Sequence, residues 1–403
     1  ARRRGRGLPL SLRPEVQAAL MEGDGQQLYQ LPIGDLLLRQ DSVTQCPNGE
    51  EGLSSFWPHF RGHLTYCSFR NPRQNPSVHG GDIVCSVETS GGRRKVGSKE
   101  MLDTQKVMRA DIVACPGEEV GLDVTASRRS SRAVTRAAEW LKEILEAKAQ
   151  DPGLGFDWHV LASIQGGGDL KLRQKACASA AAMPVAGYWI GGLGYSEDLP
   201  SRAKVLQAVT ALLPPERPRF LPLCRGTPIE VLQAVLLGVD VFELTYPTQA
   251  AAEGVALTFS FEMPPSATEG SESAEAAAVL ASLLPPSSEV SAQAPPGAVR
   301  QLALRSPECK EDFGPISENS PVKQYSRAYL YHLHEVHELL GTMLLAQHNL
   351  FMYRCFFAAI REHITAGTLR SFAAWFLQTQ TCELPIVVAP THVHSRKKQR
   401  TVL

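Results

Sequence analysis

The chain has 403 residues, of which 43% are hydrophobic and 20% charged, a composition typical of a globular protein rather than a disordered one. Its 41 basic and 41 acidic residues cancel, so nucleic-acid binding would need local basic patches instead of a global field. The nine scattered cysteines form no C-x-x-C pair, which favours a reducing compartment. No apolar run approaches the roughly 20 residues that span a bilayer.

Residues 1–20 contain the basic stretch "ARRRGRGLPLSLRP" and predict a solvated N-terminal arm. The following region, 21–262, is predicted to be the core domain, because from about residue 110 short apolar runs alternate with amphipathic helical patterns. We expect strands at 110–115, 156–164, 185–193, 219–224 and 239–244, and helices at 131–149, 170–182, 201–213 and 228–238. This alternation predicts βαβ crossovers and a parallel sheet.

A barrel and a doubly wound sheet both fit this rhythm. Two features favour the TIM (β/α)8 barrel. Gly or polar residues end several predicted strands, as expected where the carboxyl ends of barrel strands build one shared site; they are Gln165, Gly166, Gly167, Gly191, Gly192 and Glu243. No G-x-G-x-x-G follows an early strand, which disfavours a dinucleotide-binding fold.

The C-terminal third changes in composition. Residues 263–305 are predicted to be an insertion rich in Ser, Pro, Ala and Glu, mostly mobile on the surface, with a short helix in its Ala-Leu portion. A helical C-terminal region is expected over 306–378, with one long helical stretch from about Lys323. The basic tail, 379–403, contains "HSRKKQR" and is predicted to be disordered.

Three glycine-containing segments gain specificity from their order. Taken alone, glycine loops of this kind are usually only tight turns. This chain, however, contains three such motifs in series: I-Q-G-G…L-R (164–173), G-x-x-I-G-G-L-x-x-x-E (187–197) and G-V-D-x-F-E…P-T (238–248). Together with "YSRAYLYHL" (325–333) and "QHN" (347–349), they resemble the tRNA-guanine transglycosylase family, called queuine tRNA-ribosyltransferase in eukaryotes. The resemblance implies a TIM barrel that exchanges guanine at the tRNA anticodon wobble position for a queuine-type base.

The resemblance also implies the remnant of a ligand pocket. Its candidate residues are Gln165, Gly166, Gly167, Gly191, Gly192 and Asp240.

The chain departs from the family pattern at its catalytic positions. Glu243 stands where the resemblance implies a nucleophilic Asp, and its extra methylene moves the carboxylate by roughly 1.5 Å, where about 1 Å can cost a hundredfold in rate. No D-S-G-G-F-Q supplies the acid/base, and the arginines of P-T-R-x-A-R-x-G are missing from "PTQAAAEG" (247–254). We therefore expect no catalytic residue, with Glu243 as a vestigial nucleophile.

These losses resemble the non-catalytic accessory subunit of the family's eukaryotic heterodimer, which implies two partners: a catalytic subunit and tRNA. Two alternatives remain open. The chain could be an active transglycosylase with Glu243 as nucleophile, as glutamate is in retaining glycosidases. It could also be a barrel enzyme for a small metabolite, although fold alone names no reaction.

Zinc is a further implication of the resemblance, since family members hold it with C-x-C-x-x-C and a later His. The three cysteine positions fall on Ser317, Asn319 and Val322. His348 matches the remaining ligand, but a lone His on a mostly apolar helix is more often a packed core residue. We therefore do not expect tight zinc binding.

A basic cluster leads into the predicted helix at 131–149. Arg128, Arg129, Arg132 and Arg136 are predicted tRNA phosphate contacts, and the last two lie one turn apart. The alternative is a solvated, salt-paired helix face.

The resemblance implies a cytoplasmic location, with peripheral association at the mitochondrial outer membrane.

Overall fold

The computed structural model describes residues 28–71, 85–122, 127–151, 156–195, 197–265, 274–284 and 298–382. The predicted basic arm at 1–20 and residues 383–403 of the predicted tail lie outside the described residues.

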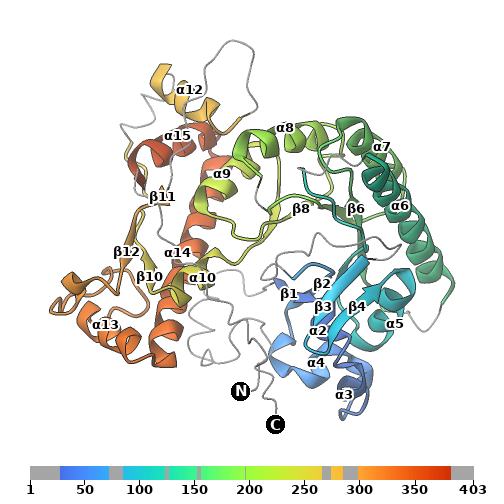
Figure 1. The fold of residues 1–403 in the computed structure, drawn as a ribbon, viewed down its shortest axis with the longest axis horizontal. Coiled ribbons are helices and arrows are strands. Elements are labelled where there is room, and N and C mark those ends of the chain that lie inside the picture. The colour runs from blue at the N-terminus through green and yellow to red at the C-terminus, as the bar shows by residue number, and fades with distance from the viewer. Residues whose placement is uncertain are drawn as a thin grey trace, which may run out of the picture.

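A parallel sheet of seven strands forms the centre of the fold (Figure 1). Its strands, in both chain and sheet order, are β1 (Leu28–Pro32), β2 (Leu64–Ser68), β5 (Ile112–Ala114), β6 (His159–Ile164), β7 (Gly187–Ile190), β8 (Arg219–Pro222) and β9 (Val241–Glu243). The strands of this sheet follow one another in chain order, as in a TIM barrel, and the sheet curls into a nearly closed barrel. The predicted TIM-like α/β fold is confirmed.

The barrel differs from an ideal eight-stranded one at its last position. After β9, the chain forms α10 (Tyr246–Ala252) and then β10 (Val255–Leu257), which pairs antiparallel with β12 (Gln301–Ala303). In the described residues no backbone ladder joins β9 to β1. Side chains bridge this seam instead, because Gln30 Nε2 lies 3.4 Å from Glu243 Oε2.

Helices cover the outside of the barrel, as Figure 1 shows for α6, α7 and α8. The covering helices are α5 (Ser98–Met108), α6 (Ser127–Gln150), α7 (Leu170–Ala181), α8 (Leu199–Thr210) and α9 (Pro228–Leu236). Helix α6 shows why the sequence folds this way: Ala133, Ala137, Leu141 and Ile144 recur at helical spacing and are all buried. Its observed start is four residues earlier than the predicted residue 131.

The N-terminal part of the barrel was not resolved into elements by the sequence analysis. Between β1 and β2 lie α2 (Ile33–Leu36), α3 (Gln40–Thr44), η1 (Gly49–Glu51), α4 (Leu53–Phe56) and η2 (Pro58–Phe60). An antiparallel hairpin of β3 (Cys85–Thr89) and β4 (Gly92–Val96) precedes α5. These short elements lack the periodicity that identifies longer helices.

The C-terminal region packs beside β9 and β10 and is drawn in orange and red in Figure 1. Its elements are α12 (Ala274–Ala281), β11 (Ala298–Val299), β12, η4 (Pro307–Cys309), α13 (Arg327–Glu335), α14 (Leu339–Thr365), α15 (Leu369–Thr379) and β13 (Thr381–Cys382). The expected short helix in the Ala-Leu portion is thus α12. Just after it, Leu283 is buried against the C-terminal core.

The long helical stretch expected from Lys323 is three helices. The breaks occur at His337 and Gly367, whose φ angles are +58° and +72°, in the left-handed region that ends helices. The predicted domain boundaries at 262 and 306 remain predictions. None of the helices within the described ranges is long and apolar enough to cross a membrane.

Candidate functional site

The predicted site residues converge at the carboxyl ends of the barrel strands, with one exception. Gln165, Gly166 and Gly167 follow β6, Gly191 and Gly192 follow β7, and Glu243 ends β9. Asp240 precedes β9 and is exposed at the opposite end of that strand, where it accepts a hydrogen bond from the backbone N–H of Arg219 at 2.9 Å. The structure does not bring Asp240 together with the other candidates.

Both carboxylate oxygens of Glu243 are occupied by hydrogen-bond donors of the protein itself. Oε1 accepts from the Tyr66 hydroxyl at 2.7 Å and from Trp189 Nε1 at 2.6 Å. Oε2 accepts from Ser68 Oγ at 3.2 Å and, at a longer 3.4 Å, from Gln30 Nε2. The donors come from β1, β2 and β7, so this one carboxylate links three other strands to β9.

This environment is unsuited to a nucleophile. Glu243 is only 4% exposed, and its two closest donors, Tyr66 and Trp189, are 1% and 0% exposed. Burial raises the pKa of Glu243, while the hydrogen bonds from Trp189 and Tyr66 act to lower it. An attacking carboxylate needs a lone pair facing the substrate carbon, and here the lone pairs face buried donors of the barrel interior.

The remnant of the ligand pocket is filled by the chain's own side chains. Gln165 is 0% exposed and donates from Nε2 to Ser163 Oγ at 2.9 Å. A Cβ on Gly191 would lie 2.3 Å from Gln165 Nε2 and 2.6 Å from the Trp189 ring, and a Cβ on Gly117 would lie 2.7 Å from the same Nε2. These glycines therefore make room for Gln165 and for Trp189, whose Nε1 donates to Glu243.

Arg173, a fully buried side chain, holds the glycine loops after β6 and β7 together. Its Nε donates to the Gly167 carbonyl at 2.9 Å, and its Nη1 donates to the carbonyls of Ile164 and Gly191, each at 2.8 Å. Burial lowers the pKa of Arg173 to about 10. Only glycine fits at position 192, because the φ angle there is +75° and a Cβ would lie 2.5 Å from the Val120 carbonyl oxygen.

A second buried arginine, Arg70, connects the loops after β2, β5, β7 and β8. It makes a two-pronged ion pair with Glu119, with Nε to Oε2 at 2.8 Å, and its Nη1 donates to the carbonyls of Leu193 and Pro222 at 2.8 Å. Although burial alone would lower the pKa of Arg70, the Glu119 carboxylate raises it. Arg70 was not predicted from the sequence, because no spacing rule links it to partners that are 49 to 152 positions away.

The four predicted phosphate-contacting arginines divide into two pairs on α6. Arg129 and Arg136 both bind Glu118, at 2.9 and 3.1 Å, and their side chains are only 20% and 13% exposed. Arg128 and Arg132 are exposed, and within the described residues neither forms an ion pair. The alternative of a salt-paired face thus fits the first pair, while the second pair faces solvent.

The zinc positions implied by the resemblance do not form a metal site. Ser317 is half-buried, Asn319 is exposed and Val322 is buried. His348 is fully buried, with Nδ1 3.0 Å from Ser320 Oγ and Nε2 2.9 Å from the Leu257 carbonyl. Among the residues that the structure describes, no three His, Cys, Asp or Glu are grouped to hold a metal, so the residues present do not fit zinc.

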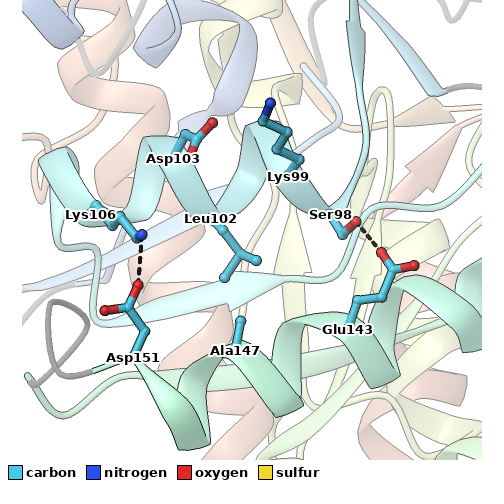
Figure 2. A pocket seen from close by; sticks show the side chains of 8 residues that line it. All are labelled: Ser98, Lys99, Leu102, Asp103, Lys106, Glu143, Ala147 and Asp151. Atoms are coloured by element: carbon cyan, nitrogen blue, oxygen red, sulfur yellow. Dashed lines mark hydrogen bonds and ion pairs between the residues drawn. The ribbon is translucent and has the colours of Figure 1, made fainter.

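A separate groove lies between α5 and α6 on the outer wall of the barrel (Figure 2). Two polar pairs cross it: Ser98 donates to Glu143, and Lys106 pairs with Asp151 at 2.6 Å. Leu102 and Ala147 form its apolar floor, as Figure 2 shows. None of the residues lining the groove belongs to the strands or loops around Glu243, so it is not part of the candidate site.

Comparison with known proteins shows sequence similarity to one family along most of the chain. The sequence profile of the family described as queuine tRNA-ribosyltransferase (TGT) matches residues 48–381. The chain is 29% identical over 321 residues to the queuine tRNA-ribosyltransferase accessory subunit 2 of Xenopus laevis, covering 76% of each protein. It is 28% identical to the protein of the same name from Homo sapiens, covering 85% of this chain and 83% of that protein.

A bacterial relative is similar over a smaller share. The queuine tRNA-ribosyltransferase of Brucella suis biovar 1 is 28% identical, covering 70% of this chain and 62% of that protein. Because the family profile spans most of the chain, this protein belongs to the queuine tRNA-ribosyltransferase family.

The buried position of Glu243 generates a stability prediction. Glu243→Ala leaves the donors of Tyr66 and Trp189 without an acceptor in the barrel interior, so we expect the free energy of unfolding to fall by about 3–5 kcal/mol. Urea unfolding measures the change. The matched control is Asp240→Ala, which removes an exposed carboxylate just before the same strand and should cost about 1 kcal/mol or less. Unchanged stability of Glu243→Ala would contradict the structural role.

Proposed function

We propose that this protein is a non-catalytic accessory subunit of queuine tRNA-ribosyltransferase. It pairs with a catalytic subunit of the same family, binds tRNA, and supports the exchange of guanine for queuine at the wobble position of the anticodon. The observation that carries the proposal is the enclosure of Glu243, whose oxygens both accept hydrogen bonds from the barrel interior. The proposal is supported by the names of the animal relatives, which are called accessory subunits.

The alternative of an active transglycosylase with Glu243 as nucleophile is the weaker hypothesis. It requires the carboxylate to exchange the Tyr66 and Trp189 donors for a ribose, and it requires the Trp189 ring to move away from Glu243. That rearrangement would expose side chains that are 0–4% accessible. No observation on the strand ends favours a small-metabolite enzyme.

The test combines association with activity. The purified chain is mixed with a catalytic subunit of the family, and the mixture is analysed by gel filtration and by incorporation of radiolabelled guanine into tRNA. We expect co-elution, together with exchange that depends on both chains. The isolated chain should be inactive. Exchange by the isolated chain that is abolished in Glu243→Gln would instead establish the catalytic alternative.

The surface proposed to receive the catalytic subunit lies at the junction of α13 and α14, at the lower left of Figure 1. Three large apolar side chains are exposed there, Val336 (51%), Leu339 (62%) and Leu340 (39%), and Tyr329 (39%) is exposed in the first turn of α13. We call this group the α13–α14 surface. Clusters of exposed apolar residues lower the solubility of a protein and usually mark protein interfaces. Formation of the heterodimer would bury the α13–α14 surface.

The α13–α14 surface predicts the effect of a charge placed at its most exposed member. Leu339→Glu should weaken the complex with the catalytic subunit about tenfold to a hundredfold, because an interfacial carboxylate would be desolvated without a partner. Analytical ultracentrifugation or titration calorimetry measures the affinity. Leu212→Glu is the control, since Leu212 is 46% exposed at the end of α8. Equal weakening by both variants would refute the assignment of this surface.

The proposed tRNA contacts are Arg128 and Arg132, the exposed pair of α6. The helix begins at Ser127, so both cations lie in its first two turns, next to the loop that carries Glu118. Since the whole chain has no net charge, attraction to phosphates has to come from such local groups. Arg129 and Arg136 contribute indirectly, by fixing this part of the helix to Glu118.

A salt titration distinguishes a phosphate contact from a merely exposed cation. Arg132→Ala should weaken tRNA binding and reduce the slope of log affinity against log salt by about 0.7–1, the amount expected from one lost phosphate contact. Lys142→Ala, which removes an exposed cation further along the same helix, should leave the slope unchanged. The proposal fails if the two variants behave alike.

The proposed location is the cytoplasm, with peripheral association at the mitochondrial outer membrane. The resemblance to the eukaryotic family carries this proposal. Cysteines without disulfides support a reducing compartment; they are Cys46, Cys67, Cys115, Cys177, Cys224, Cys309 and Cys355. Fractionation of cells that express the tagged chain, with salt extraction of the mitochondrial fraction, tests both parts.

A further inference from the structure

A buried hydrogen-bond chain centred on His348 joins three separate parts of the C-terminal region. His348 belongs to α14, Ser320 to the loop that precedes α13, and Leu257 to β10. Their relative exposures are 0%, 3% and 0%. The Nδ1 atom of His348 lies 3.0 Å from Ser320 Oγ, and its Nε2 atom lies 2.9 Å from the Leu257 carbonyl.

Only one protonation state satisfies every member of this chain. The Leu257 carbonyl can only accept, so His348 carries its proton on Nε2 and donates it there. Nδ1 is then the acceptor, and the Ser320 hydroxyl donates to it. The Ser320 oxygen in turn accepts from the backbone N–H of Val322 at 3.2 Å. A neutral imidazole therefore has both nitrogens paired within the protein.

The next residue of the helix extends the same connection. Asn349 Oδ1 accepts from the backbone N–H of Leu257 at 2.9 Å, and its Nδ2 donates to the carbonyls of Pro247 at 3.1 Å and Val255 at 2.9 Å. Strand β10 has three residues and one antiparallel partner. These side chains of α14 thus supply it with the pairing that a short edge strand lacks.

Ser320, which contacts His348, is not one of the three positions where the family's zinc-binding cysteines would fall. Counting back from "SRAY" places ligands at 317, 319 and 322, yet Asn319 is exposed and Val322 is an apolar residue of the local core. Ser320 lies between them and turns its hydroxyl inward. A metal ion would need the Nδ1 or Nε2 lone pair of His348, and each nitrogen already has a protein partner.

We infer that the Ser320–His348–Leu257 hydrogen-bond chain is a metal-independent structural staple, which fixes the 317–322 loop and β10 to α14 where a zinc site would otherwise do so. The C-terminal region of this protein therefore folds without zinc and does not depend on zinc supply. This inference is separate from the proposed function, because it concerns how the region is held together and not what it binds.

The first experiment measures metal content and stability together. The full chain is incubated with excess zinc, freed of unbound metal by gel filtration and analysed by mass spectrometry for metals, and its thermal unfolding is followed with and without a chelator. We expect zinc far below one atom per chain and the same unfolding midpoint in both conditions. About one tightly held zinc per chain, whose removal lowers the midpoint, would overturn the inference.

Two neighbouring serines provide the matched variants. Ser320→Ala removes the donor to a buried nitrogen and should lower the unfolding midpoint by about 2–6 °C. Ser317→Ala, at a counted cysteine position, should leave the midpoint unchanged. If Ser320→Ala does not fold, nitrogen NMR of the wild-type chain decides the question, because His348 should show a protonated Nε2 and an unprotonated Nδ1. A larger loss from Ser317→Ala, or the opposite tautomer, would refute the staple.

Discussion

The cost of burying a carboxylate inside an apolar barrel constrains the whole centre of this fold. An isolated charge there would be strongly destabilising unless donors replaced its lost water. The chain provides them from Tyr66, Ser68 and Trp189, with a longer contact from Gln30. Because β9 and β1 share no ladder in the described structure, the Gln30 contact, at 3.4 Å, also connects the two edges of the seven-stranded sheet. The carboxylate is therefore part of the barrel's closure.

The same physical solution recurs around the strand ends. Arg70 is neutralised by Glu119 and donates to two loop carbonyls, while Arg173 donates to three carbonyls of the glycine loops. Each guanidinium has a rigid fork of donors, which suits the joining of several backbone segments. An active site would keep such groups available to a substrate. Here most of their donors are directed at the protein and fix the loops, although Arg173 Nη2 and the neighbouring Gln165 Oε1 are buried without a hydrogen-bond partner among the described residues.

The sequence predicted the parts of the fold that depend on local pattern and missed those that depend on distant partners. Alternation of apolar runs and amphipathic helices was sufficient for the barrel, and the motif order was sufficient for the family. Tyr66 lies 177 positions from Glu243, and no spacing rule connects them. Ser320 was missed for another reason: the spacing of the family's zinc-binding cysteines pointed to positions 317, 319 and 322 and not to position 320. Asp240 was grouped with the pocket because it is close in sequence, although it sits at the other end of a three-residue strand.

With Glu243 enclosed in the barrel, the surfaces proposed for partners lie on the outside of the fold. Two kinds of exposed side chain lie on separate elements: apolar side chains at the α13–α14 surface and, at the start of α6, Arg128 and Arg132, which form no ion pair within the described residues. We propose that burial of apolar area gives the first its affinity for protein and that charge gives the second its affinity for phosphates. Since the two lie on separate elements, the proposed binding of a catalytic subunit and the proposed binding of tRNA do not compete for one surface. The hydrogen-bonded staple at His348 belongs to the same arrangement, because it fixes α14, the helix that begins with Leu339, to the strand that follows the barrel.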